Sequence, residues 1–88
     1  MNIGTVAKLK VECLGNKPGT LGVAFNKYGL NGIQIIFENG NYDGFSKDEQ
    51  ETFLEYVRDE ETLSSYVFRH VIQTSRDFDA GFFDKAFK

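Results

Sequence analysis

The sequence contains no tryptophan, one proline and one cysteine, and it has no long hydrophobic run. Its single cysteine, Cys13, cannot form a disulfide within the chain, which is typical of proteins in a reducing cytoplasm. No apolar stretch approaches the roughly 18 residues of a membrane-spanning helix. The first residues also lack the basic and apolar regions of a signal peptide. We therefore expect a cytoplasmic protein with no membrane partner.

Basic side chains are in the minority, with 10 Lys and Arg against 13 Asp and Glu, for a net charge of −3. Residues 1–47 carry five lysines and three acidic side chains, for +2, whereas residues 48–88 carry five basic and ten acidic side chains, for −5. Nucleic-acid binding needs a basic face that displaces counterions from the phosphates. The charge balance therefore disfavours a nucleic-acid partner.

Aromatic residues, by contrast, are plentiful. The chain has 88 residues, which predicts one domain, and 41% of them are hydrophobic, which argues against disorder. Nine phenylalanines and four tyrosines are a high load for this length. Either they form an aromatic core or some of them face a partner.

Three strands are predicted over residues 5–13, 20–28 and 33–38, because apolar residues alternate there with period two. Turn-rich segments join them, so the economical arrangement is an antiparallel meander. Small residues at Gly22 and Ala24 indicate a close approach of another backbone or a bulge. The residues expected to face the helix from this sheet are Leu21, Val23, Ile33, Ile35 and Phe37.

A helix is predicted over residues 47–58. Ser46 and Glu49 have the spacing of a capping box, in which each side chain satisfies the other residue's free backbone N–H. The apolar face of this helix would carry Gln50, Phe53, Leu54 and Val57.

The last third of the chain is less decided. Residues 64–73 could form a helix by periodicity, but their β-branched and aromatic residues favour a fourth strand, which we prefer. Residues 74–79 resemble a turn, and Asp79 can cap a short helix over residues 80–87. The predicted fold is α+β: a three-stranded antiparallel meander, one amphipathic helix packed on the sheet, then a fourth strand and a short C-terminal helix.

An acidic stripe is the leading candidate for a partner-binding site. Residues 48–61 hold seven acidic side chains and one arginine, and four of the acids would follow one face of the predicted helix. Clustered carboxylates can bind a basic surface, although the same pattern also suits a solvated helix face. Nearby tyrosines could anchor an interface. The proposed contact residues are Asp48, Glu51, Glu55, Asp59, Tyr42 and Tyr56.

Four phenylalanines near the C-terminus form a second candidate surface. They either close the core or leave part of the cluster exposed for contact between copies of the chain. These residues are Phe78, Phe82, Phe83 and Phe87.

Residues for metal binding or catalysis are scarce. Residues 39–44 resemble the start of a calcium loop, but Gln50 stands where a bidentate glutamate is needed, so turn formation is the better interpretation. Cys13 and His70 are the only residues of their kinds, and Cys13 falls on an apolar strand face. We expect no metal, no cofactor and no catalytic activity.

The functional hypothesis is therefore a small non-catalytic protein-binding module, an accessory regulator or inhibitor that acts through its acidic, tyrosine-containing helix face. The alternative is a small-ligand or nucleotide-binding domain, with the pocket within one chain or between subunits of an oligomer. In that case an anion would be held by Lys8, Lys10 and Lys27.

Overall fold

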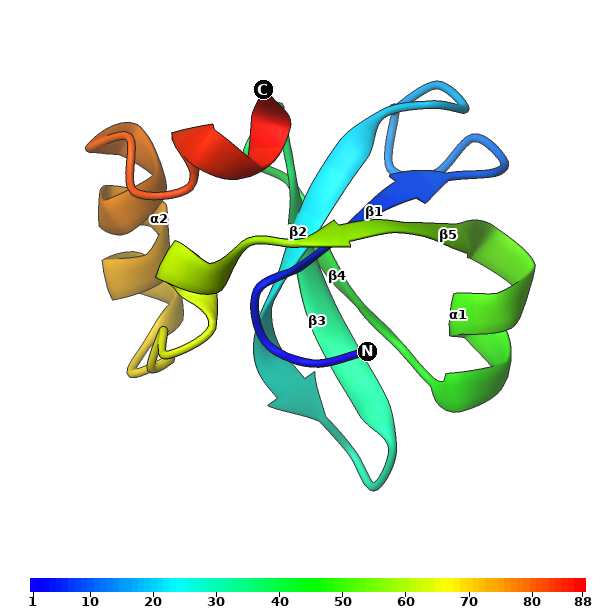
Figure 1. Ribbon diagram of the computed structural model, residues 1–88, viewed down its shortest axis with the longest axis horizontal. Helices are drawn as coiled ribbons and strands as arrows, with labels where there is room; N and C mark the ends of the chain where they lie inside the picture. The colour runs from blue at the N-terminus through cyan, green and yellow to red at the C-terminus, as the bar shows by residue number, and fades with distance from the viewer.

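The computed structural model describes all residues from 1 to 88 and measures 29 × 27 × 23 Å. It confirms an α+β fold, with five antiparallel strands in one sheet and two α-helices (Figure 1). The strands are β1 (Thr5–Leu9), β2 (Leu21–Tyr28), β3 (Gly32–Phe37), β4 (Tyr42–Phe45) and β5 (Leu54–Asp59). The helices are α1 (Lys47–Phe53) and α2 (Val71–Asp79), with short 3₁₀ helices η1 (Glu61–Leu63) and η2 (Asp84–Phe87).

The strand order in the sheet is β4-β3-β2-β1-β5. Strands β1 to β3 form the predicted meander, and β4, which we had interpreted as turn sequence, extends it by one strand. Strand β5 returns to the other side and pairs with β1. Phe45 of β4 and Leu54 of β5 belong to one apolar cluster although they lie on opposite edge strands, which shows that the sheet is curled.

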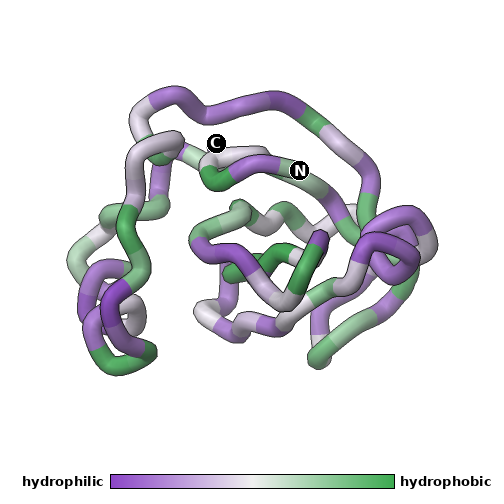
Figure 2. The backbone as a smooth tube through the Cα atoms, turned by 90° about the horizontal axis from the view of Figure 1, so that it is seen from below, coloured by the Kyte–Doolittle hydropathy of each residue, from purple (hydrophilic) through white to green (hydrophobic).

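Both faces of the sheet are covered, which explains why so many strand residues are apolar. Hydrophobic and hydrophilic positions follow one another along the tube in Figure 2. The inner cluster contains Ala7, Leu9, Ala24, Ile33, Ile35, Phe37, Phe45 and Leu54. The outer cluster contains Val6, Val23, Phe25, Ile36, Leu63, Phe83 and Ala86.

The side chains of β2 point to other faces of the sheet than predicted. Val23 lies opposite Ile36 in the outer cluster, so it does not share a face with Ile33 and Ile35. The inner positions of β2 are Gly22 and Ala24 instead. A Cβ atom on Gly22 would lie 2.5 Å from Cγ2 of Ile35, so side chains rather than another backbone approach here. The pairing of β2 with β3 shifts between Ala24 and Asn26, in agreement with the predicted bulge.

The predicted helix over residues 47–58 is too long. Helix α1 ends at Phe53, and the following residues form β5, with Leu54 opposite Leu9 of β1. The Leu54 N–H still donates to the Gln50 carbonyl oxygen, and the residues from Leu54 to Asp59 pair with β1, whose edge would otherwise be unpaired. The prediction that Leu54 and Val57 continue the apolar face of the helix beyond Phe53 is therefore wrong.

The predictions for the C-terminal third were wrong in detail. The segment preferred as a strand runs without regular structure to His70, whose Nδ1 accepts a 3.1 Å hydrogen bond from Ile72 N at the start of α2. Phe68 of this segment packs on Phe25, with ring centroids 6.0 Å apart. Its aromatic residues thus cover the outer cluster. Residue types that are frequent in strands are frequent there partly because their side chains pack well, so the same types can cover an apolar surface without pairing as a strand. The expected terminal helix is reduced to η2.

The capping box at Ser46 is confirmed, with Ser46 Oγ accepting from Glu49 N at 3.2 Å and Glu49 Oε1 accepting from Ser46 N at 2.9 Å. Replacement of Ser46 by alanine is expected to cost about 1 kcal/mol, as measured by urea unfolding. The exposed Ser75→Ala is the control.

The hydrogen bonds from the Ser46 backbone and side chain lower the pKa of the Glu49 carboxyl. The depressed pKa gives stability that is present above the unfolded-state pKa and lost as pH falls through the folded-state value. Ser46→Ala should therefore raise the Glu49 pKa and reduce this acid dependence, as an NMR titration would show. An unchanged Glu49 titration would contradict this prediction.

Candidate functional site

The four acidic residues of the predicted stripe lie on two elements rather than one helix face. Asp48 and Glu51 belong to α1, whereas Glu55 and Asp59 belong to β5, and all four are exposed. They stay on neighbouring parts of the molecule, because β5 follows α1 without a loop. We call Asp48, Glu51, Glu55, Tyr56 and Val57 the α1–β5 surface.

Strand β5 is an edge strand, so its outer side has no partner strand. Tyr56 is 57% exposed and Val57 is 40% exposed. The pairing shifts by one residue here, since Val6 and Ala7 lie opposite Arg58 and Tyr56, which leaves Val57 as a bulge. A bulge hinders the addition of a further strand. This edge therefore offers side chains, rather than a regular backbone ladder, to a partner.

Two lysines of the N-terminal half partly neutralise this surface. Lys8 Nζ lies 3.3 Å from Glu55 Oε2 in a half-exposed ion pair, and Lys10 Nζ donates a 2.6 Å hydrogen bond to the Glu51 carbonyl oxygen. The carboxylates of Asp48 and Glu51 have no ion-pair partner. The surface thus keeps free negative charge beside an exposed aromatic ring.

Asp59 has a structural task within β5. Its Oδ1 accepts a 3.0 Å hydrogen bond from the buried Thr5 hydroxyl, and its Oδ2 accepts one from the Tyr56 hydroxyl at 3.2 Å. Desolvation, followed by the charge and hydrogen bond of Asp59, raises the pKa of Tyr56. Asp59 therefore orients the Tyr56 ring as well as adding charge.

Tyr42 lies away from Tyr56. It lies on β4 opposite Ile36 of the outer cluster, and its ring packs edge-on against Phe25 with centroids 6.0 Å apart, whereas Tyr56 lies opposite Ala7 of the inner cluster. The structure therefore separates the two tyrosines that the predicted interface combined.

The C-terminal phenylalanines lie mostly in the core. Phe83 is buried in the outer cluster, and Phe78 and Phe87 pack against it. Phe82 is 54% exposed, with its ring 5.5 Å from that of Tyr66. Phe78 and Phe87 are partly buried, and only Phe82 of the four is largely exposed.

A small hollow of about 260 Å³ lies beside Phe82. At its wall the Tyr66 hydroxyl donates a 2.7 Å hydrogen bond to Asp77 Oδ2, and Gln73 donates to Oδ1 at 2.9 Å. The Tyr66 hydrogen bond, with smaller contributions from Gln73 and Arg69, lowers the pKa of Asp77. The sequence did not indicate this group, because residues 64–73 were expected to be a strand.

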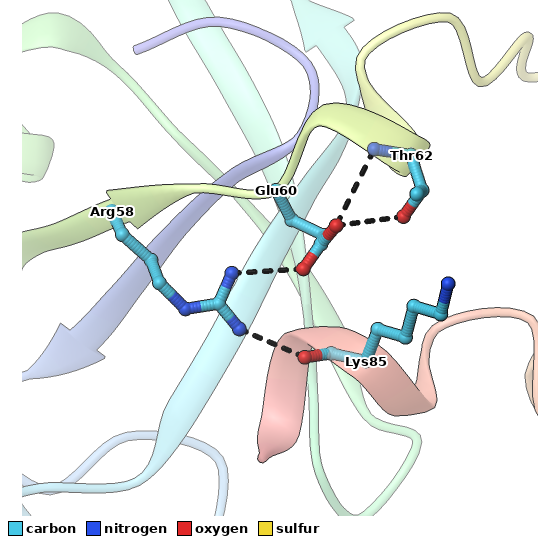
Figure 3. Close-up of polar contacts among 4 residues, drawn as sticks. All are labelled: Arg58, Glu60, Thr62 and Lys85. Atoms are coloured by element: carbon cyan, nitrogen blue, oxygen red, sulfur yellow. Dashed lines mark hydrogen bonds and ion pairs between the residues drawn. The ribbon is translucent and has the colours of Figure 1, made fainter.

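A second polar group joins β5 to the two 3₁₀ helices (Figure 3). Arg58 Nη1 donates to Glu60 Oε1 at 2.9 Å, and Nη2 donates to the Lys85 carbonyl oxygen at 2.8 Å. Thr62 Oγ1 donates to Glu60 Oε2 at 2.8 Å. The hydrogen bonds from Thr62, then from Arg58, lower the pKa of Glu60. Glu60 of the acidic run is thus used to hold the C-terminal segment.

The three lysines of the predicted anion site are not brought together. Lys8 lies opposite Leu21 of β2, and Lys27 is six residues further along that strand, roughly 20 Å away at about 3.3 Å per residue. Lys27 instead lines a cleft with Lys47, between the β2–β3 turn and α1.

The other residues considered from the sequence have local roles. Asn39 Oδ1 accepts a 3.0 Å hydrogen bond from Asn41 N within the β3–β4 turn, which confirms turn formation there. Cys13 packs against the inner cluster, and burial, with smaller effects from Asp43 and Glu49, raises the pKa of its thiol. None of the helices has the length and apolar character needed to cross a membrane.

Comparisons of the chain with protein-family models, with curated proteins and with solved structures found no match.

Proposed function

We propose that the chain is a small non-catalytic protein-binding module, an accessory regulator or inhibitor, whose α1–β5 surface binds a basic region of another protein. The observation that carries the proposal is the exposure of Tyr56 and Val57 on an unpaired sheet edge, beside the free carboxylates of Asp48 and Glu51.

The composition of this surface suits an interface. Tyrosine is enriched among residues that dominate binding energy, since it buries a large ring with few rotatable bonds and keeps a hydroxyl for hydrogen bonding. The Tyr56 ring is already oriented by Asp59, so little freedom is lost on binding. The surrounding carboxylates would attract a basic partner and fix its orientation.

The residues that a catalytic mechanism would use have other contacts, which supports a non-catalytic role. His70 caps α2 through Nδ1, and Cys13 packs against the inner cluster with its thiol pKa raised. A raised pKa disfavours the thiolate that acts as nucleophile.

Charge reversal tests the proposal. The triple variant Asp48→Lys, Glu51→Lys and Glu55→Lys should lose the proteins that the parent captures from an extract of its native host. Asp59 is left unchanged because it holds Thr5. A matched control is Glu12→Lys, Asp79→Lys and Asp84→Lys, three exposed acids outside the α1–β5 surface that give the same change in net charge.

Tyr56→Ala should weaken the captured complex by about tenfold or more, in the range of interface hot spots. Binding of a purified captured partner can be measured by calorimetry. If both the triple variant and Tyr56→Ala bind as the parent does, the α1–β5 surface is not the interface.

A further inference from the structure

A cleft of about 540 Å³ is lined by residues of the β2–β3 turn and of α1. Figure 1 shows this turn at the end of the β2–β3 hairpin. The cleft volume is within the range of sites for small molecules. Its lining is mainly polar and includes Lys27, Gly29, Asn31, Lys47 and Gln50. The cleft lies apart from Tyr56 and Val57, and the inference drawn from it does not depend on the proposed function.

Two cations from different elements line this cleft. Lys27 comes from the end of β2 and Lys47 from α1, and neither has an ion-pair or hydrogen-bond partner in the chain. Lys8 and Lys10 differ, because each already contacts α1 or β5. Of the three lysines in the predicted anion site, only Lys27 is therefore free to meet an outside anion, and Lys47 joins it at the cleft.

The turn adds backbone donors to the same cleft. The N–H groups of Gly29, Leu30 and Asn31 donate to no backbone or side-chain acceptor in the chain. Gly29 has a φ of +61°. Successive N–H groups in such turns form concave binding places for anions. The three residues that carry these N–H groups line the cleft together with the two lysines.

The turn is also held in place. Gln50 Nε2 donates to the Asn31 carbonyl oxygen at 3.1 Å and to the Phe45 carbonyl oxygen at 3.2 Å. The Gln50 side chain thus joins α1 to the β2–β3 turn and to the end of β4. A tied turn loses less freedom on binding than a free one.

We propose that this cleft binds the phosphate of a soluble phosphorylated molecule of nucleotide size, with Lys27, Lys47 and the amides of the β2–β3 turn as its ligands. A smaller hollow of about 300 Å³ shares the turn and Lys47 with the cleft but is lined by Asp48 and not by Lys27. The Asp48 carboxylate would repel the anion from that hollow and so favour the Lys27 side.

The test is an NMR titration of the full chain with pyrophosphate, AMP, ADP and adenosine. The phosphate compounds should shift the amide signals of residues 27–31 and 47, whereas adenosine, which lacks phosphate, should not. Lys27→Gln with Lys47→Gln should weaken binding about tenfold or more, because charged hydrogen bonds are lost. The control Lys17→Gln with Lys88→Gln makes the same charge change elsewhere and should bind as the parent does.

Three results would each overturn the proposal. The first is that no phosphate compound shifts the amide signals at about 10 mM, and the second is that the shifts are confined to other residues. The third is that the cleft variant and the control variant weaken binding equally. Binding to phosphatidic acid vesicles without a response to the soluble compounds would also overturn it. Failure of the α1–β5 charge reversal leaves these measurements unaffected, so the two proposals fail separately.

Discussion

Phe37→Ala is expected to destabilise the protein by about 3–5 kcal/mol, the range for truncating a fully buried phenylalanine. Phe37 has no exposed surface and packs edge-on against Phe45, with ring centroids 6.2 Å apart. Its ring also lies where a Cβ on Gly22 would be, so it fills the space that the missing side chain leaves. The loss is comparable to the roughly 5 kcal/mol at the lower end of total stabilities for native domains. Circular dichroism during urea unfolding measures it.

Phe82→Ala is the matched control, because it removes the same atoms from a side chain that is 54% exposed. We expect a cost of about 1 kcal/mol or less there, since part of the ring is already in water. Equal losses for Phe37→Ala and Phe82→Ala would contradict the assignment of the inner cluster as the core.

Gly4→Ala is expected to cost about 2–4 kcal/mol, for two reasons that add. Gly4 has a φ of +93°, which a residue with a Cβ adopts only with strain. A Cβ there would also lie 2.9 Å from Ser64 N and 3.0 Å from the Glu60 carbonyl oxygen. Backbone atoms cannot rotate away, so the start of β1 or η1 would have to move.

Gly19 separates the two causes, because it has the same φ of +93° and no atom within 4 Å of the added Cβ. Gly19→Ala should therefore cost only the conformational strain, about 1–2 kcal/mol. The difference between the two variants, measured by thermal or urea unfolding, gives the cost of separating β1 from η1. A difference near zero would mean that Gly4 is not packed against this backbone.

Both functional proposals depend on where α1 ends. Because the chain leaves the helix at Phe53, Tyr56 and Val57 reach an open sheet edge instead of a helix face. At the other end of α1, Lys47 meets the β2–β3 turn. The same seven-residue helix thus contributes carboxylates to one candidate surface and a lysine to the other.

The sequence predicted well the features that short-range chemistry decides. Alternating apolar residues placed β2 and β3, with each boundary within one residue of the observed one. Ser46 and Glu49 placed the start of α1, because a capping box is formed by four neighbouring residues. Gly22 and Ala24 indicated the irregularity in β2, where the pairing with β3 shifts between Ala24 and Asn26.

The sequence predicted less well those features that depend on distant partners. Residues 54–59 have an apolar spacing compatible with a helix, and only the unpaired edge of β1 makes them a strand. Residues 66–70 have strand-forming side chains but find an aromatic surface to cover instead of an edge to pair with. The candidate sites were misplaced for the same reason. Only the tertiary structure brings Lys27 and Lys47 to one cleft, and only it places Tyr42 and Tyr56 on different edge strands.

The amino-acid sequence by itself determined the α+β class, the β1–β3 meander, the start of the first helix and the excess of carboxylates after residue 47, because each follows from neighbouring residues or from composition. Only the tertiary structure decided where α1 ends, that both sheet faces are buried, and which lysines, tyrosines and acids share a surface. Backbone pairing and burial join residues far apart in the chain. Their free energy exceeds the intrinsic preference of a residue for helix or strand, which is about a few tenths of a kcal/mol.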